Sequence, residues 1–328
     1  MFTRKTFKTL TCWSLAAFSI MATLDNVQAA FPEQPVKILV GFPAGQASDT
    51  SARRIAAKMG EVLKQSVLVD NRPGAAGIIS HTALKNSPPD GYTILMGSSG
   101  TLVINPALYS KLAYDPIKDF EPVALVAAAP LVMFTSANSP INNLKELIAL
   151  AKANPGKVTY GSSGSGTTGH IAMELLKKQA GIFMLHIPYK GSPQMVTDVA
   201  GGQVDVAFDT AASVLQLAKS GRVKLIGIAN AKRFAIAPDL PTLSEQGLKG
   251  FEAVAWSAIM APKGTPPDAI SQLNKAINVA LKDPAVLETF AASGSYPLGG
   301  SADDLQKFMA AETLRWGKAV KDSGAQID

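Results

Sequence analysis

The sequence predicts an α/β protein built from two similar lobes. Short apolar runs typical of strands alternate with amphipathic helical segments, which indicates βαβ units and a sheet covered on both faces. Apolar extended segments near residues 130 and 255 would carry the chain from one lobe to the other and back. We therefore expect lobe 1 to comprise residues 30–131 and 252–328, and lobe 2 to comprise residues 132–251.

Residues 1–29 have the pattern of an export signal. A basic start that contains Arg4 and Lys5 is followed by a mostly apolar stretch over 10–24, and Ala29 ends a segment suited to cleavage. A transmembrane anchor is the alternative, but the apolar stretch is short for a span and no stop-transfer pattern follows it. We therefore expect cleavage after Ala29 and an exported mature protein.

Composition narrows the classes of function. The one cysteine, Cys12, lies in the leader, and a chain of 328 residues can bury a sufficient core without disulfides. The formal net charge of +6 comes from basic residues scattered among acids. No basic block is interleaved with aromatics, which argues against nucleic-acid binding. The three histidines lack the spacing of a metal site, and we expect no metal and no cofactor.

Lobe 1 is expected to start with three strands and two helices. The continuous apolar run 38–42 is typical of a buried parallel strand, and 51–63 has helical periodicity. A second strand is predicted at 67–69, a helix at 75–85 and a third strand at 92–96, after an Asp-Gly turn.

The apolar stretch 119–138 is expected to hold two consecutive strands, because Pro122 and Pro130 interrupt it. A return strand is expected over 251–260, followed by helices of which Ser301 begins the last. The units expected between the two crossings are helix 143–152, strand 157–160, a helix ending at 179, strand 184–189, helix 194–200, strand 204–208, helix 211–219 and strand 224–229.

Three loops at strand ends share one chemistry. Residues 41–49, 97–101 and 161–168 are rich in glycine and in hydroxyl or amide side chains, and none contains Arg or Lys. Ligands of open α/β sheets bind beyond the carboxyl ends of strands, and backbone N–H groups there can hold an anion. We therefore expect a clamp for a small carboxylate. Its candidate ligand-binding residues are Phe42, Ala44, Gly45, Gln46, Ser98, Ser99, Thr101, Ser163, Ser165, Gly166, Thr167, His170, Tyr189 and Asp209.

Two nucleotide-binding motifs fail in the third loop. Gly164-x-Gly166-x-x-Gly169 has the spacing of a dinucleotide fingerprint, but no acid follows about 20 residues later to hold a ribose. A phosphate-binding P-loop needs lysine where Thr167 stands.

A secreted serine hydrolase is the competing class. Neither glycine-serine loop contains the G-x-S-x-G elbow, although a triad joining a serine near Ser163 to His170 or His186 and Asp209 stays open. Asp209 could instead accept a hydrogen bond from a ligand hydroxyl or amine, orient a water, or cap the following helix. We expect no catalytic residues, because no nucleophile has an identifiable base.

A set of short motifs runs through residues 31–328. They are Phe42-Pro43-Ala44-Gly45 with Asp49, Asn71-Arg72-Pro73-Gly74-Ala75, Pro88-Pro89-Asp90-Gly91-Tyr92, Tyr160-Gly161-Ser162-Ser163-Gly164, Pro188-Tyr189-Lys190-Gly191-Ser192, Gly201-Gly202-Gln203-Val204, and Ala231-Lys232-Arg233 with Pro238-Asp239-Leu240-Pro241-Thr242. Together they resemble the substrate-binding proteins of tripartite tricarboxylate transporters, the Bug family.

The resemblance implies a type II periplasmic binding protein, a two-lobed Venus flytrap that closes over a small carboxylate and delivers it to the membrane subunits of a transporter. It implies that loop 42–49 holds one carboxylate and that loop 161–168 and the Asp209 region complete the pocket. The chain departs from the family pattern at Gln46 and Ala47, where glycines are usual, so Gln46 could narrow the pocket or contact the ligand. A ligand-sensing lobe for a membrane receptor shares the fold. We expect a monomer.

Overall fold

The computed structural model describes residues 31–325, so the predicted leader and its cleavage site lie outside the described residues. The strands are β1 (Val36–Val40), β2 (Val67–Asn71), β3 (Thr93–Ser98), β4 (Phe120–Ser136), β5 (Thr159–Ser162), β6 (Leu185–Pro188), β7 (Val206–Thr210), β8 (Val223–Ala229), β9 (Val254–Pro262) and β10 (Tyr296–Pro297). The helices are α2 (Ala47–Leu63), α3 (Ile78–Lys85), α4 (Asn105–Leu108), α5 (Leu144–Ala153), α6 (Thr168–Ala180), α7 (Ser192–Ala200), α8 (Ala211–Lys219), α9 (Pro267–Ala280), α10 (Pro284–Ala292) and α11 (Ala302–Ser323), with short turns η1 (Ala75–Gly77) and η2 (Gly100–Ile104).

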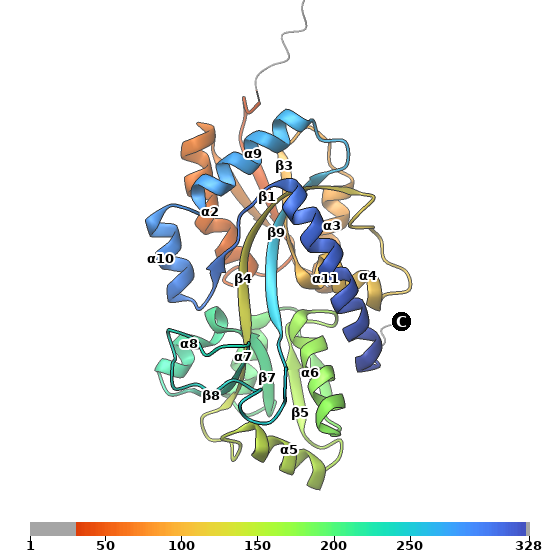
Figure 1. Ribbon diagram of the computed structural model, residues 1–328, viewed down its shortest axis with the longest axis vertical. Coiled ribbons are helices and arrows are strands. Elements are labelled where there is room, and N and C mark those ends of the chain that lie inside the picture. Colours follow the sequence, from red (N-terminus) through yellow and green to blue (C-terminus); the bar gives the residue numbers. More distant parts are fainter. Residues whose placement is uncertain (1–30, 326–328) are drawn as a thin grey trace, which may run out of the picture.

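The predicted alternation of strands and helices is confirmed. The strand order is β2-β1-β3-β9-β4-β7-β5-β6, with β8 and β10 also paired to β4. Strand β1 pairs in parallel with β2 and β3, and β5 pairs in parallel with β6 and β7. Figure 1 shows the two resulting groups of elements one above the other, with β4 and β9 running between them.

Strand β4 differs from the expected pair of strands. It is one continuous strand that pairs with β9 as far as Pro130 and with β7 and β8 from Leu131 onward. Proline has no N–H to donate to a ladder. Here Pro122 stands at a shift of register and Pro130 where the partner changes, so neither proline has to end the strand. The prediction of two strands is therefore wrong, while the crossing that it described is present.

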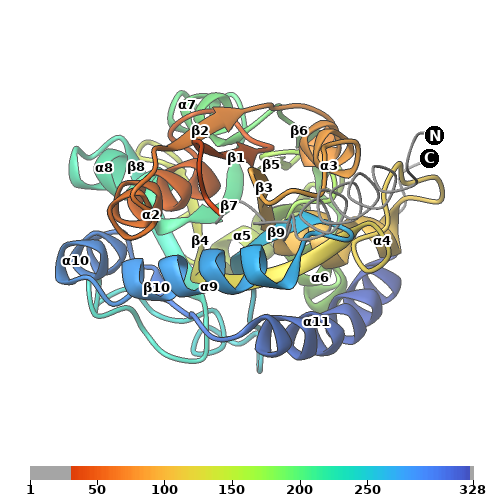
Figure 2. The ribbon, with the colours of Figure 1, turned by 90° about the horizontal axis from the view of Figure 1, so that it is seen from above.

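Helices cover both faces of the upper sheet. Seen from above, α2, α9 and α10 lie together on one side, and α3, α4 and α11 lie on the other (Figure 2). Helix α2 buries a stripe that includes Ile55, Met59 and Leu63, which is the spacing expected of an amphipathic helix facing a sheet. The sheet is thereby covered on both faces, and the loops that line the cleft follow the ends of its strands. No helix within residues 31–325 combines the length and apolar character needed to cross a membrane.

Candidate ligand-binding cleft

A cleft, open on one side, lies where the two groups of elements meet. Its walls come from the starts of α2, α6, α8 and β9, the end of β3 and the middle of β4. The predicted residues that line it are Phe42, Gln46, Ser98, Ser99, Ser163, Thr167 and Asp209.

The other predicted residues lie outside the lining and support it. Gly45 donates its N–H to Asp49 Oδ2 (2.9 Å), and the Thr101 hydroxyl bonds to the backbone of Ser98. The remaining ones act in the same way: Gly166 N donates to His170 Nδ1, Ser165 O accepts from Tyr109 Oη, Tyr189 Oη donates to Asp198, and Ala44 belongs to the turn before α2. None of these other predicted residues belongs to the lining of the cleft.

Sequence reasoning missed further lining residues, most of which lie inside helices or strands. They are Ala47, Ser48, Thr50, Ser51, Arg54, Ala76, Gly100, Ala127, Ala129, Leu131, Thr168, Gly169, Phe208, Thr210, Ala212, Ala255, Trp256, Ser257, Ser293 and Ser295. The helical periodicity of α2 could have indicated some of them from the sequence, because it places Ser51 and Arg54 on the same face as Ala47.

Three helices begin at this cleft without a side-chain cap. The N-cap residues of α2, α6 and α8 are Gln46, Thr167 and Thr210, and the side chain of none of them accepts a hydrogen bond from a backbone N–H of its own helix. Away from the cleft, α5, α10 and α11 are capped by Asn143, Asp283 and Ser301 respectively, while α9 also starts without a side-chain cap. The first N–H groups of a helix have no intrahelical partner and carry a partial positive charge. The cleft can therefore hold an anion on backbone donors.

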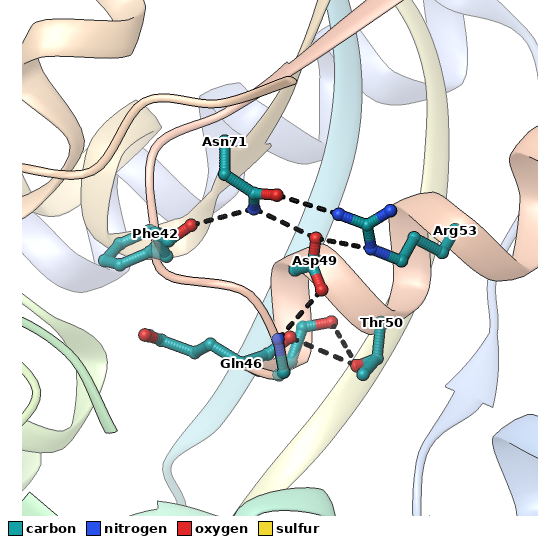
Figure 3. A network of polar contacts seen from close by, with 8 residues as sticks. Phe42, Gln46, Asp49, Thr50, Arg53 and Asn71 are labelled. Atoms are coloured by element: carbon teal, nitrogen blue, oxygen red, sulfur yellow. Dashed lines mark hydrogen bonds and ion pairs between the residues drawn. The ribbon is translucent and has the colours of Figure 1, made fainter. Parts of the chain in front are cut away.

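Asp49 fixes the loop that precedes α2. Its Oδ1 accepts from Arg53 Nε (2.9 Å) and Asn71 Nδ2 (2.9 Å), and Asn71 Nδ2 also donates to the carbonyl of Phe42 (3.0 Å) (Figure 3). Burial by itself would raise the pKa of this carboxyl, but the hydrogen bonds from Arg53, Gly45 and Asn71 outweigh burial and lower the pKa. Asp49 is only 2% exposed and is absent from the lining, so it shapes the cleft without facing a ligand.

Gln46 joins the two sides of the cleft. Its Oε1 accepts a hydrogen bond from the backbone N–H of Ser192 (3.3 Å), the first residue of α7. The approach is close, since a Cβ on Gly191, whose φ is +144°, would stand 2.7 Å from Pro43. Gln46 thus supplies the cap that α7 lacks, in addition to lining the cleft.

Replacing Gln46 with alanine is expected to remove this contact, which is worth about 0.5 to 1.5 kcal/mol. The melting temperature without ligand should fall by about 1 to 4 °C, and small-angle scattering should show a larger radius of gyration. Gln65→Ala, the same change outside the cleft, is the control. An unchanged radius and melting temperature in Gln46→Ala would contradict the bridging role.

Further contacts cross behind the cleft. Ser99 Oγ lies 2.8 Å from Thr168 Oγ1 and accepts from the backbone N–H of Trp256 (3.3 Å). Gly166 approaches the other side so closely that a Cβ there would overlap Asn105 Oδ1. Because these groups pair with one another, the hydroxyls of Ser99 and Thr168 are oriented before any ligand arrives.

Asp209 is the one acid on the lining. Its Oδ1 accepts from Thr210 N (2.7 Å), just before α8, and from the hydroxyl of Ser213 (3.2 Å) in the first turn. It accepts from no backbone N–H within α8, so the predicted cap of this helix is absent. Its Oδ2 is buried and has no hydrogen-bond partner among the described residues. Burial raises the pKa of this carboxyl more than the surrounding hydrogen bonds lower it. One oxygen is thus engaged with α8 and the other is available.

Arg54 is the one lysine or arginine among the lining residues. Its Nη1 donates to Ser293 Oγ (3.0 Å), and its guanidinium lies 5.3 Å from the centre of the Phe290 ring. Within residues 31–325 it forms no ion pair with a carboxylate. The prediction that the loops lack cations holds for the loops, but the cleft as a whole contains this one.

The residues of the open hydrolase alternative do not assemble. His186 Nε2 lies 2.7 Å from Ser162 Oγ rather than Ser163, and Ser162 is fully buried outside the cleft lining. His186 stacks on His170 at 4.2 Å between ring centroids, and burial lowers the pKa of His170 to about 4 and of His186 to about 3. Among the described residues, Asp209 bonds to neither histidine.

Comparison with known proteins identifies the family. A family model described as "Tripartite tricarboxylate transporter family receptor" matches residues 51–325. The chain belongs to this receptor family. It is 37% identical to Protein BugT of Bordetella pertussis over 298 residues, which cover 90% of this chain and 91% of BugT.

Solved structures of this kind are similar throughout. R. palustris Rpa4515 with adipate is 34% identical, with a TM-score of 0.88 over 90% of this chain and 100% of that chain. The periplasmic binding protein BugD is 35% identical, with a TM-score of 0.86 over 90% and 99% of the two chains. The predicted family and the two-lobed periplasmic-binding-protein fold are confirmed.

Proposed function

We propose that this protein binds a small carboxylate between its two lobes in the periplasm, as a monomer, and delivers it to the membrane subunits of a tripartite tricarboxylate transporter. We propose further that it is not an enzyme, that residues 30–131 and 252–328 form lobe 1, and that residues 132–251 form lobe 2. The change of β4 partner between Pro130 and Leu131 supports these boundaries.

The observation that carries the proposal is the meeting of three uncapped helix starts at one cleft. Each helix N-terminus stabilises an anion by about 0.3 to 1 kcal/mol when exposed and up to about 2 when partly buried. The side chains of Ser48, Ser51 and Ser163 add hydroxyl donors along the same lining. A carboxylate is planar and small enough to accept several such hydrogen bonds at once.

The family supports the same chemistry. The similar protein Rpa4515 was solved with adipate, a dicarboxylate, and this chain shares its fold over 90% of its length. We infer export from the leader pattern together with the periplasmic relative BugD. Sequencing of the mature protein from a periplasmic extract should begin at Ala30, and retention of residues 1–29 would contradict cleavage.

A thermal-shift screen against carboxylates tests the function. A ligand at 100 times its Kd should stabilise the folded protein by about 2.7 kcal/mol. Trp256 lines the cleft and Trp316 does not, so fluorescence should report the same binding. The matched control is the neutral diamide of each acid. No stabilisation by any carboxylate, or equal stabilisation by the diamides, would count against the proposal.

A further inference from the structure

We propose that Arg54, with Ser293 and Ser295, forms a second anion site in the cleft, so that the ligand carries two carboxylates, one at the helix starts and the other at Arg54. This inference rests on the proposed function and deepens it. It names the class of ligand, a dicarboxylate of medium length, and the side chain that selects that class.

The guanidinium of Arg54 is poorly satisfied by the protein itself. It is half-buried, and burial lowers its pKa, yet it donates only to the neutral hydroxyl of Ser293 and forms no ion pair with a described carboxylate. Neighbouring Arg53, by contrast, is paired with Asp49. A partly desolvated cation without a counterion is unfavourable, and arginine binds carboxylates through two parallel hydrogen bonds. A ligand carboxylate is the partner that this group lacks.

The surroundings of Arg54 suit an anion. Ser293 Oγ and Ser295 Oγ lie 2.8 Å apart, and both residues line the cleft beside Arg54. The turn that they flank lies against the start of α8, since a Cβ on Gly294 would stand 3.1 Å from that of Ala211. Thr210 and Ala212 of this uncapped helix start also line the cleft. Asp209 is the single opposing charge, and it forms no ion pair with Arg54.

The spacing sets the length of the ligand. Arg54 stands seven residues after Ala47, the first residue of α2, which places their Cα atoms about 10 Å apart along the helix axis. Helical side chains lean toward the N-terminus, which favours a separation between the guanidinium and the helix start that is shorter than the separation of the Cα atoms. A ligand that reaches both positions is an extended dicarboxylate such as glutarate, adipate or pimelate.

Calorimetric titration with adipate and with hexanoate measures how much the second carboxylate contributes to affinity. The two acids have the same chain length, and only adipate carries the second carboxylate. The wild-type protein should prefer adipate at least tenfold. Arg54→Gln should weaken adipate binding about ten- to hundredfold and hexanoate binding less than threefold. Lys58→Gln is the matched control: it removes one positive charge from the same helix outside the cleft and should leave both affinities unchanged.

Further measurements keep the test decisive if Arg54→Gln folds poorly. Arg54→Lys keeps the charge and should retain part of the preference, and monomethyl adipate should bind the wild-type protein like hexanoate. Equal weakening of adipate and hexanoate in Arg54→Gln, or equal wild-type affinities for the two, would overturn the second site while the proposed function stands. Failure of every carboxylate to bind the wild-type protein would overturn both.

Discussion

Replacing Asp49 with alanine is expected to lower the free energy of unfolding by about 2 to 4 kcal/mol and to abolish ligand binding. The buried carboxylate accepts hydrogen bonds from Arg53, Asn71 and Gly45, and each would lose that bond. Bonds to a charged group contribute about 1.5 to 3 kcal/mol, and an orphaned buried donor adds its own desolvation cost. Arg53 is 52% exposed and can turn to water, so most of the loss comes from Gly45 and Asn71.

Binding should disappear for a geometrical reason. Asp49 holds Gly45 directly and helps to orient Asn71, which binds the carbonyl of Phe42, so its loss loosens the segment that leads into α2 (Figure 3). The backbone donors at the start of α2 would then no longer be held in one position. Pre-organised donors bind more tightly than mobile ones because less ordering accompanies binding.

Urea unfolding and ligand titration measure the two effects of Asp49→Ala separately. Asp70→Ala is the control, because Asp70 lies nearby on β2 and pairs with Arg72 at the surface. That change should alter stability by less than about 1 kcal/mol and leave binding intact. An Asp49→Ala protein that binds normally would show that the loop is held by other contacts.

Acidification from pH 7 to pH 5 is expected to lower the free energy of unfolding by about 3 to 6 kcal/mol. Burial lowers the pKa of His81 and His170 to about 4 and of His186 to about 3, against 6.5 for a free histidine. The unfolded chain therefore binds protons between pH 6.5 and 4 that the folded chain does not. Each unit of pH in this window costs about 1.4 kcal/mol per histidine.

The sign follows from the direction of the shifts. Depressed pKa values make stability complete above about pH 6.5 and cause its loss as the pH falls toward 4 and 3. Lys177 helps to depress the pKa of both His170 and His186, while Glu174 opposes this at His186. Asp209, whose pKa is raised, acts in the opposite sense and reduces the total.

Urea titrations at pH 7, 6 and 5 and constant ionic strength measure this dependence. In His186→Gln, which can still bond to Ser162, the dependence should shrink by about a third, since one of the three buried histidines is gone. Equal free energies of unfolding at pH 7 and pH 5 in the wild-type protein would show that the buried histidines titrate normally.

Most of the fold could be predicted from local patterns. The buried run 38–42, the period of α2 and the caps at Asp283 and Ser301 depend on residues close together in sequence. The prediction for β4 was wrong because the effect of a proline on a strand depends on which strands pair with it at that position. Those partners, β7, β8 and β9, come from far along the chain.

At the candidate site, the difference between local sequence patterns and contacts made by distant segments is clearer than in the fold. The sequence alone determined the alternating elements, the family motifs and the glycine-serine loops, since these depend on composition and short spacing. Only the tertiary structure decided which side chains face the cleft. Arg53 and Arg54 are adjacent, yet about 100° of helical rotation sends one to Asp49 and the other into the cleft. That outcome depends on where α2 packs, because packing between distant segments fixes the direction of every side chain on it.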